Sequence, residues 1–343
     1  MAPGKRIQEI DALRGVAVLL MVFSHGLHWA YTGTAHDIIS FFGVLSPGDL
    51  AAPLFFFTAG LSLYYSLTTL LKRNFSLSEL QRHYSFRLAK LFFIGVTLSL
   101  NWGVLQAQAI SIFILVTSIL FLLEHFSFRQ IRIYILAFGI LALGLHFSLV
   151  PTNCNIFSGQ FPIFAILAFN AVGFYFAPCL RIFKLHYRCL GLGTVLIAVA
   201  LILAEAGFSL ARFNAPIAFI VLGIGLSLVL LGLLNLIVKQ STSVFSHLTR
   251  VGRDALFLFV FHYLAFYLPL FFTGFMNKMG ITSSLVFASI ILIVITLTAK
   301  LREHSSFSIY HLVDALLLVL VQNIEYLAGK QIQGNLQHRS VEE

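Results

Sequence analysis

Apolar runs long enough to cross a membrane as helices recur along the whole chain, and they constrain its fold more than any other feature. About 17–25 residues of helix span the roughly 30 Å of hydrocarbon in a bilayer. We place such runs at residues 14–31, 52–71, 91–104, 106–123, 131–150, 161–178, 190–208, 215–237, 255–272, 283–299 and 309–327. Only 10% of the residues are charged, against about 25% in soluble domains, so the chain could not cover a water-facing surface. The prediction is an all-α, polytopic membrane protein of about 11 (10–12) transmembrane helices in one bundle.

No polar stretch is long enough for a sizeable soluble domain. We therefore expect residues 1–330 to form a single integral-membrane domain and residues 331–343 to form a polar tail. The first apolar run is too long for a cleaved signal peptide and is interpreted as a retained helix.

The positive charge is distributed unevenly between the two sides of the predicted bundle. The net charge is +9, and with a cytoplasmic N-terminus 17 of the 22 Lys and Arg residues fall in inner segments. This distribution is the positive-inside signature of a membrane protein, so the charge indicates orientation and not binding to nucleic acid. The three cysteines have neither the number nor the spacing of a disulfide framework or a zinc site, and no metal is expected.

The first apolar run contains ionisable residues. Arg14 and His25 are 11 residues apart, so they project from one helix face about 16 Å apart along the axis, and His28 shares that face. A titratable group near the bilayer centre normally faces the bundle interior or a watery cavity. His36 and Asp49 follow in the outer loop region. Asp49 either caps the second helix or pairs with a histidine and raises its basicity.

Several stretches resemble the transmembrane acyltransferase superfamily. "RIQEIDALRGVAVLLMVFSHG" resembles its opening motif, an Arg, ten residues and a His, which Arg14 and His25 match. "DLAAPLFFFTAGLSL" and "WGVLQAQAISIFI" are similar to the branch that contains heparan-alpha-glucosaminide N-acetyltransferase and its bacterial relatives. "FPIFAILAFNAVGFYFAP" and "VGRDALFLFVFHYL" resemble later helices of that branch, so the resemblance covers most of residues 6–270.

The resemblance implies transfer of an acetyl group from cytoplasmic acetyl-CoA to a sugar amine or hydroxyl beyond the membrane. It also implies His36, eleven residues beyond the motif, as the residue of the chemistry. The heparan branch has Asn where His25 stands, whereas the O-acetylating branch has His there. This chain has both histidines, so N- and O-acetylation both remain open.

The residue types suit such a transfer. A neutral imidazole acts as a base near neutral pH or carries the acetyl group as a covalent intermediate. His36 is the first candidate, His25 the second, and Asp49 or Asp37 would orient the base. Further candidates for contacts with the donor or the oxyanion are Asn101, Trp102, Gln106 and the apolar-flanked His262.

Arginines on the basic side are candidates for holding the phosphates of CoA. Besides Arg14, these are Arg82, Arg87 and Arg253, whose planar guanidinium groups suit phosphate oxygens. Each candidate also has a purely structural interpretation: the arginines as lipid anchors, Asn101, Trp102 and Gln106 as turn residues, and the histidines as packed side chains.

The predicted function is a membrane acetyltransferase that uses acetyl-CoA and a sugar or glycan acceptor. It would be multi-pass, in a bacterial inner (plasma) membrane, with the lipid bilayer as its surroundings and a homodimer as one possible assembly. The alternatives are a transporter or flippase of a glycan lipid or small anion, and a non-catalytic membrane scaffold or sensor. Turnover of acetyl-CoA distinguishes the first interpretation from the other two.

Overall fold

The computed structural model describes residues 7–40, 45–99, 102–152, 154–181, 185–238 and 243–304. Up to Glu303 they belong to one compact unit. Within these residues the regular structure is helical, apart from one isolated β-bridge between Tyr31 and Met279. The all-α fold is therefore confirmed.

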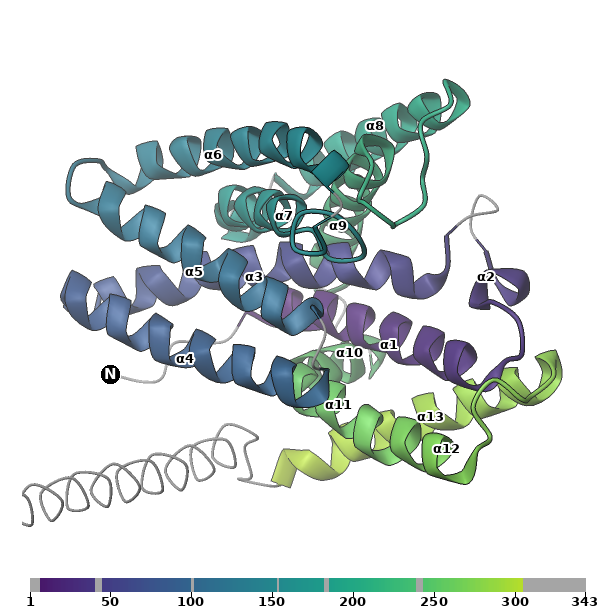
Figure 1. Ribbon diagram of the computed structural model, residues 1–343. Helices are drawn as coiled ribbons and strands as arrows, with labels where there is room; N and C mark the ends of the chain where they lie inside the picture. The colour runs from purple at the N-terminus through teal and green to yellow at the C-terminus, as the bar shows by residue number, and fades with distance from the viewer. Residues whose placement is uncertain are drawn as a thin grey trace, which may run out of the picture. The chain divides into compact units, whose positions relative to one another are not determined.

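The helices follow one another along the chain with short connections (Figure 1). In order they are α1 (Gln8–Ala30), α2 (Ala35–Ile38), α3 (Pro47–Leu71), α4 (Leu77–Leu98), α5 (Val104–Leu123), α6 (Phe128–Leu149), η1 (Val150–Thr152), α7 (Ile163–Phe176), η2 (Ala177–Arg181), α8 (Leu185–Glu205), α9 (Ile217–Val238), α10 (Ser243–Arg253), α11 (Ala255–His262), the π-helical turn η3 (Tyr263–Tyr267), α12 (Leu268–Thr273), α13 (Ile281–Leu301) and η4 (Arg302–His304).

Eight helical segments in the described part of the chain are long and apolar enough to cross a membrane. They confirm a multi-pass membrane protein. The run predicted at 91–104 is wrong in its limits, because α4 begins at Leu77 and ends at Leu98, and Gly103 precedes α5. The run predicted at 309–327 and the domain limit at 330 lie outside the described residues.

Two other helices differ from the prediction. The run at 161–178 forms α7, whose 14 residues are fewer than the eight candidate spans have. The amphipathic helix α10 lies between the runs predicted at 215–237 and 255–272, where no spanning run is expected because its sequence "SVFSHLTRVGR" mixes polar and apolar residues over only 11 positions.

Local sequence signals determine where several helices begin. Ser76 and Glu79 form a capping box at the start of α4, in which each side chain bonds the backbone N–H of the other. Ser46 and Asp49 do the same for α3, with Pro47 at the first helical position. These side chains satisfy backbone donors that the first turn of a helix leaves without partners.

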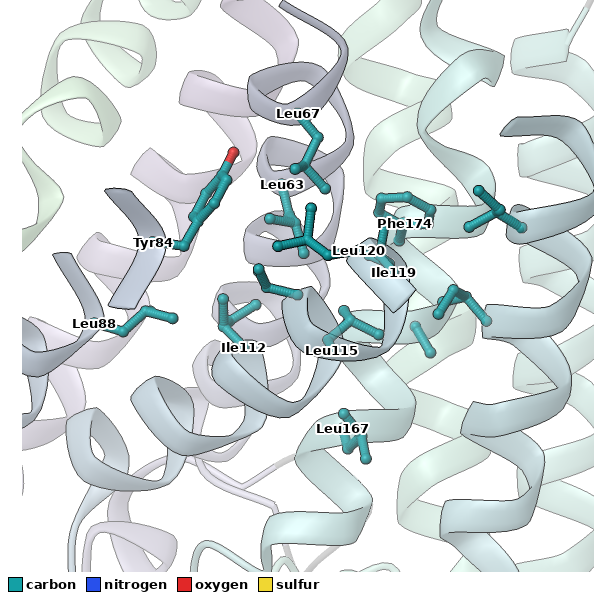
Figure 2. Packing of buried hydrophobic residues seen from close by; sticks show 14 of the residues in the cluster. Leu63, Leu67, Tyr84, Leu88, Ile112, Leu115, Ile119, Leu120, Leu167 and Phe174 are labelled. Atoms are coloured by element: carbon teal, nitrogen blue, oxygen red, sulfur yellow. The ribbon is translucent and has the colours of Figure 1, made fainter. Parts of the chain in front are cut away.

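The centre of the bundle is α1, which packs against α3, α9, α10, α11 and α13. A separate apolar cluster joins α3 to α4, α5, α6 and α7. Figure 2 shows its interior, where Leu63 and Leu67 of α3 meet Leu115 and Ile119 of α5 and Phe174 of α7. Because hydrocarbon tails are as apolar as these side chains, close van der Waals packing stabilises such contacts within a membrane.

Glycine permits a close helix crossing between α1 and α10. A Cβ atom on Gly252 would lie 1.7 Å from the carbonyl oxygen of Asp11, and one on Gly15 would lie 2.1 Å from the carbonyl oxygen of Leu248. Only residues without a side chain fit at this distance, as in small-residue crossings of membrane helices generally. The crossing brings α10 against the first turns of α1, where Arg14 lies.

Candidate functional site

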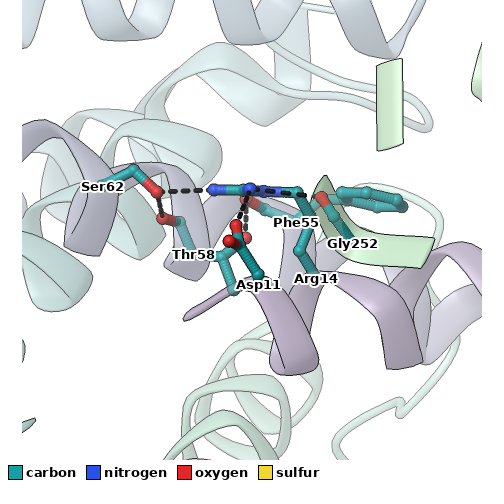
Figure 3. Close-up of polar contacts among 6 residues, drawn as sticks. All are labelled: Asp11, Arg14, Phe55, Thr58, Ser62 and Gly252. Carbon is teal, nitrogen blue, oxygen red and sulfur yellow. Dashed lines mark hydrogen bonds and ion pairs between the residues drawn. The ribbon is translucent and has the colours of Figure 1, made fainter. Parts of the chain in front are cut away.

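Arg14 joins three helices at the first half of α1 (Figure 3). Its Nη1 donates to Asp11 Oδ1 at 2.9 Å and to the carbonyl oxygen of Gly252 at 3.3 Å, and its Nη2 donates to Ser62 Oγ at 2.6 Å. Ser62 in turn donates to the carbonyl oxygen of Thr58. The guanidinium group is thus held in a fixed orientation and is not a mobile lipid anchor.

Arg14 lines a cavity of about 570 Å³, here called the basic cavity. It is defined by the cationic or titratable residues Arg14, Arg73, His83, Arg87 and Arg253, which come from α1, the C-terminal end of α3, α4 and α10. The structure therefore brings together three of the arginines singled out in the sequence and adds Arg73 and His83. Burial, and secondly the positive charge of Arg87, lower the pKa of His83. His83 is therefore neutral near pH 7, and the arginines supply the charge.

Three turns further along α1, His25 lines a second cavity of about 250 Å³, here called the histidine cavity. Its wall includes Met21 of α1, Phe55 of α3, the connection between α4 and α5, and Phe259 and Tyr263. Apolar side chains thus form part of the wall around the imidazole, which is partly buried.

His262 lies behind His25. Its Nε2 is 2.9 Å from Nδ1 of His25, and its own Nδ1 is 3.2 Å from the carbonyl oxygen of Leu258. His262 is fully buried and is not among the residues that line the histidine cavity. Its predicted role as a residue in contact with a ligand stays a prediction.

Arg212 is a residue of the histidine cavity that the sequence analysis missed. Its Nε is 3.4 Å from Asp49 Oδ1, and its guanidinium group lies over the ring of Phe161, 5.2 Å from the centroid. Burial lowers the pKa of Arg212, and the charge of Asp49 acts in the opposite direction. A signal was present in the sequence, since Arg212 is one of the few cations that fall outside the positive-inside pattern.

Asp49 is placed as the cap of α3. Its Oδ2 accepts hydrogen bonds from the backbone N–H and the hydroxyl group of Ser46, both at 2.8 Å. Together with the ion pair to Arg212, these bonds make Asp49 the anchor of the cavity's arginine. Its predicted role as the partner of a catalytic histidine stays a prediction.

The connection between α4 and α5 forms one wall of the histidine cavity. Trp102 Nε1 donates to the carbonyl oxygen of Phe161 at 2.9 Å, and Gln106 Nε2 donates to the carbonyl oxygen of Ser99 at 2.9 Å. Both residues line the cavity, yet these donors hold the turn, as their structural interpretation expects. Asn101 lies outside the described residues.

The remaining candidates lie elsewhere. His36 belongs to the short helix α2, and its side chain is outside what the structure describes. Arg82 has an exposed side chain on α4 and is not among the residues that line the basic cavity. Within the described residues, no three His, Cys, Asp or Glu side chains are grouped for a metal ion.

A packed layer separates the two cavities, which have no lining residue in common among the described residues. On α1, Val18 lies between Arg14 and His25 and is fully buried. Thr58 of α3 and Ala255 of α11 occupy the corresponding intermediate positions and are also buried. We call Val18, Thr58 and Ala255 the separating layer.

These helices and cavities define an integral, multi-pass membrane protein whose interior carries polar residues along one helix. Residues 6–176, about half of the chain, match the model of the family described as heparan-alpha-glucosaminide N-acetyltransferase, catalytic, and the chain belongs to this family. The match includes α1 with both Arg14 and His25.

A human protein, heparan-alpha-glucosaminide N-acetyltransferase, is 29% identical to the chain over 126 residues. The similarity covers 32% of this chain and 18% of the human protein. The chain therefore matches less than a fifth of the length of that relative. The resemblance of residues 251–264 to the same branch lies beyond the matched segment and stays a prediction.

Proposed function

We propose that the protein transfers an acetyl group from acetyl-CoA to an amine or hydroxyl group of a sugar or glycan. One observation carries the proposal: a single helix, α1, presents Arg14 to a basic cavity and His25 to a second cavity three turns away. Family membership supports the same activity. Arg14 and His25, and with them the sites for the donor's phosphates and for the acceptor, lie about 16 Å apart along the helix axis.

The basic cavity suits the phosphates of CoA. Four arginines line it, and planar guanidinium groups bind phosphate oxygens through paired, charge-assisted hydrogen bonds. Arg14 is oriented by Asp11, Ser62 and Gly252. With a cytoplasmic N-terminus, which the positive-inside distribution supports, this cavity would lie on the cytoplasmic side, where acetyl-CoA is available. For the extended arm of CoA to carry the thioester along α1 toward His25, the buried residues of the separating layer would have to move apart.

The histidine cavity suits the acceptor. His25 would take the proton from the attacking amine or hydroxyl group as the new bond to the thioester carbonyl carbon forms. The C–S bond then breaks, and the proton passes from His25 to the departing thiolate of CoA. Arg212, which lines the same cavity, provides positive charge for the oxyanion that develops on the carbonyl oxygen.

His36, which the sequence analysis ranks first, is the alternative base; we rank His25 ahead of it because His25 lines a described cavity. The resemblance to the family implies it, and α2 follows directly after the helix that carries His25. With His36 as the base, the acceptor would bind nearer the loop that joins α1 to α3.

A transporter or flippase is the competing function. Two cavities with a packed layer between them are also what an alternating-access mechanism requires. A transporter would use neither cavity for chemistry and would release no thiol from acetyl-CoA.

The test is an acetyl-CoA assay on the purified protein in lipid nanodiscs. Thiol release is followed with and without glucosamine, for the wild type and for the variants His25→Ala and His36→Ala. His247→Ala is the control, because His247 lies on α10 outside both cavities. We expect acceptor-stimulated release that falls about 10²–10⁴-fold in His25→Ala, as for loss of a general base. A loss confined to His36→Ala assigns the base to α2. No release by the wild type with any amine or hydroxyl sugar would refute the proposed function.

A further inference from the structure

Two buried histidines from distant parts of the sequence contact each other directly. His25 of α1 and His262 at the end of α11 are separated by 237 residues, and their facing ring nitrogens are 2.9 Å apart. Only His25 lines the cavity, whereas His262 is fully buried. A fully buried histidine needs a partner for each of its nitrogens.

The hydrogen bonds determine which nitrogen carries each proton. The carbonyl oxygen of Leu258 can only accept, so Nδ1 of His262 is the protonated nitrogen of that ring. Nε2 of a neutral His262 is then an acceptor, and Nδ1 of His25 must donate to it. In neutral His25 the remaining nitrogen, Nε2, therefore has a free electron pair.

Aromatic packing holds both rings in this arrangement. Trp29 stacks on His25 with centroids 5.1 Å apart and on His262 with centroids 5.3 Å apart. Tyr263, the first residue of the π-helical turn, contacts both imidazoles edge-on. Rotation of either ring would disrupt these contacts, so the orientation of the histidine pair is fixed by packing as well as by hydrogen bonds.

We infer that His262 is a positioning residue that fixes His25 in the tautomer needed for proton abstraction, with Nε2 unprotonated toward the histidine cavity. The inference rests on the proposed function, in which His25 is the base. When His25 takes the proton from the acceptor at Nε2, its Nδ1–H stays bonded to Nε2 of His262, which stabilises the positive charge. The proton then leaves from Nε2 to the CoA thiolate, and the pair returns to its starting state. In this arrangement His262 has the role that a carboxylate has in catalytic triads.

The first experiment does not depend on any activity. Solid-state NMR of the full-length protein, labelled with ¹⁵N-histidine in lipid nanodiscs, reports the tautomer of each imidazole. The signals of His25 are assigned by their absence in His25→Gln. We expect wild-type His25 to be protonated at Nδ1 and unprotonated at Nε2, and His262→Leu to give a mixture of tautomers. Protonation at Nε2 in the wild type, or an unchanged His25 spectrum in His262→Leu, overturns the inference.

The second experiment measures kcat and KM for acetyl-CoA in the assay described above. His262→Leu is expected to lower kcat by roughly 10²-fold, within the range for a general base, and to leave KM unchanged. His262→Gln retains an oxygen that accepts from Nδ1 of His25, and it should restore kcat to within about tenfold of the wild type. His247→Leu is the matched control, and circular dichroism checks that all variants are folded. If His262→Leu turns over as fast as the wild type, the inference fails while the proposed function stands. If the wild type releases no thiol, the proposed function fails while the NMR spectrum still decides on the tautomer.

Discussion

Gly252→Ala tests the close contact between α1 and α10. The new Cβ would lie 1.7 Å from the carbonyl oxygen of Asp11, whereas ordinary contact begins at 3.4 Å, so α10 would have to move away from α1 by roughly 1.7 Å. The neighbouring atoms belong to backbone and not to flexible side chains, which leaves no cheaper adjustment. Overpacking of this kind costs about 1–3 kcal/mol. The gain in helix propensity of about 1 kcal/mol from Gly to Ala offsets only part of the cost.

The matched control is Gly144→Ala. Gly144 is exposed on α6, and a Cβ there would have no neighbour within 4 Å. The same chemical change should therefore stabilise the helix by about 0.5–1 kcal/mol. The two variants share the change in helix propensity from Gly to Ala and differ only in the surroundings of the new methyl group.

The assay is the apparent melting temperature of the detergent-solubilised protein, followed by tryptophan fluorescence. The net cost is up to about 2 kcal/mol, so at about 2–4 °C per kcal/mol Gly252→Ala should melt up to roughly 8 °C below the wild type, and Gly144→Ala at or slightly above it. Because the carbonyl oxygen of Gly252 also accepts from Arg14, the KM for acetyl-CoA should rise in the first variant only. Equal melting temperatures for the two variants would refute the described crossing of α1 and α10.

Three further predictions concern charged residues. Arg87→Gln and Arg253→Gln remove cations from the basic cavity. Each should raise the KM for acetyl-CoA about tenfold or more with little change in kcat, because a charged hydrogen bond is lost. An unchanged KM in both variants would mean that the phosphates of CoA bind elsewhere. Asp49→Asn retains a cap for α3 but removes the ion pair with Arg212, so unfolding in a thermal melt should cost about 1–3 kcal/mol less than in the wild type. Bonds from the backbone and side chain of Ser76 lower the pKa of Glu79, so the stability it contributes is present above its unfolded-state pKa and is lost as the pH falls through the folded value. The protection factors for hydrogen exchange in the first turn of α4, taken relative to the intrinsic rate at each pH, should therefore fall on acidification, and Glu79→Gln should abolish that dependence.

The sequence was sufficient to predict most of the fold, because the thickness of the hydrocarbon fixes the length of an apolar helix. The prediction from the sequence failed at helix ends that the length and apolarity of a segment do not determine. The residues LFFIGVTLSL are apolar enough to suggest a span that continues to residue 104. The helix nevertheless ends at Leu98, where Trp102 and Gln106 bond carbonyl groups of the turn and its surroundings. A contact with another segment thus decides the end of α4.

Only those parts of the candidate site that lie on one helix could be predicted from the spacing of residues in the sequence. Arg14 and His25 share a helix, so their separation follows from helix geometry. The pairing of His25 with His262 joins residues 237 positions apart, and the approach of Arg212 to Asp49 depends on how a loop is placed over α3. Neither contact leaves a periodic pattern in the sequence, because tertiary packing creates both.

The separating layer has a consequence for the membrane as a whole. A continuous polar channel along α1 would let protons and small ions follow their electrochemical gradients, and each charge that crosses releases about 2.3 kcal/mol per 100 mV. Val18 exposes none of its surface and Thr58 only 1%, so the side chains at these positions pack against protein. We therefore expect the resting protein to conduct no ions along this route, so that its presence in an energised membrane would not dissipate the membrane potential.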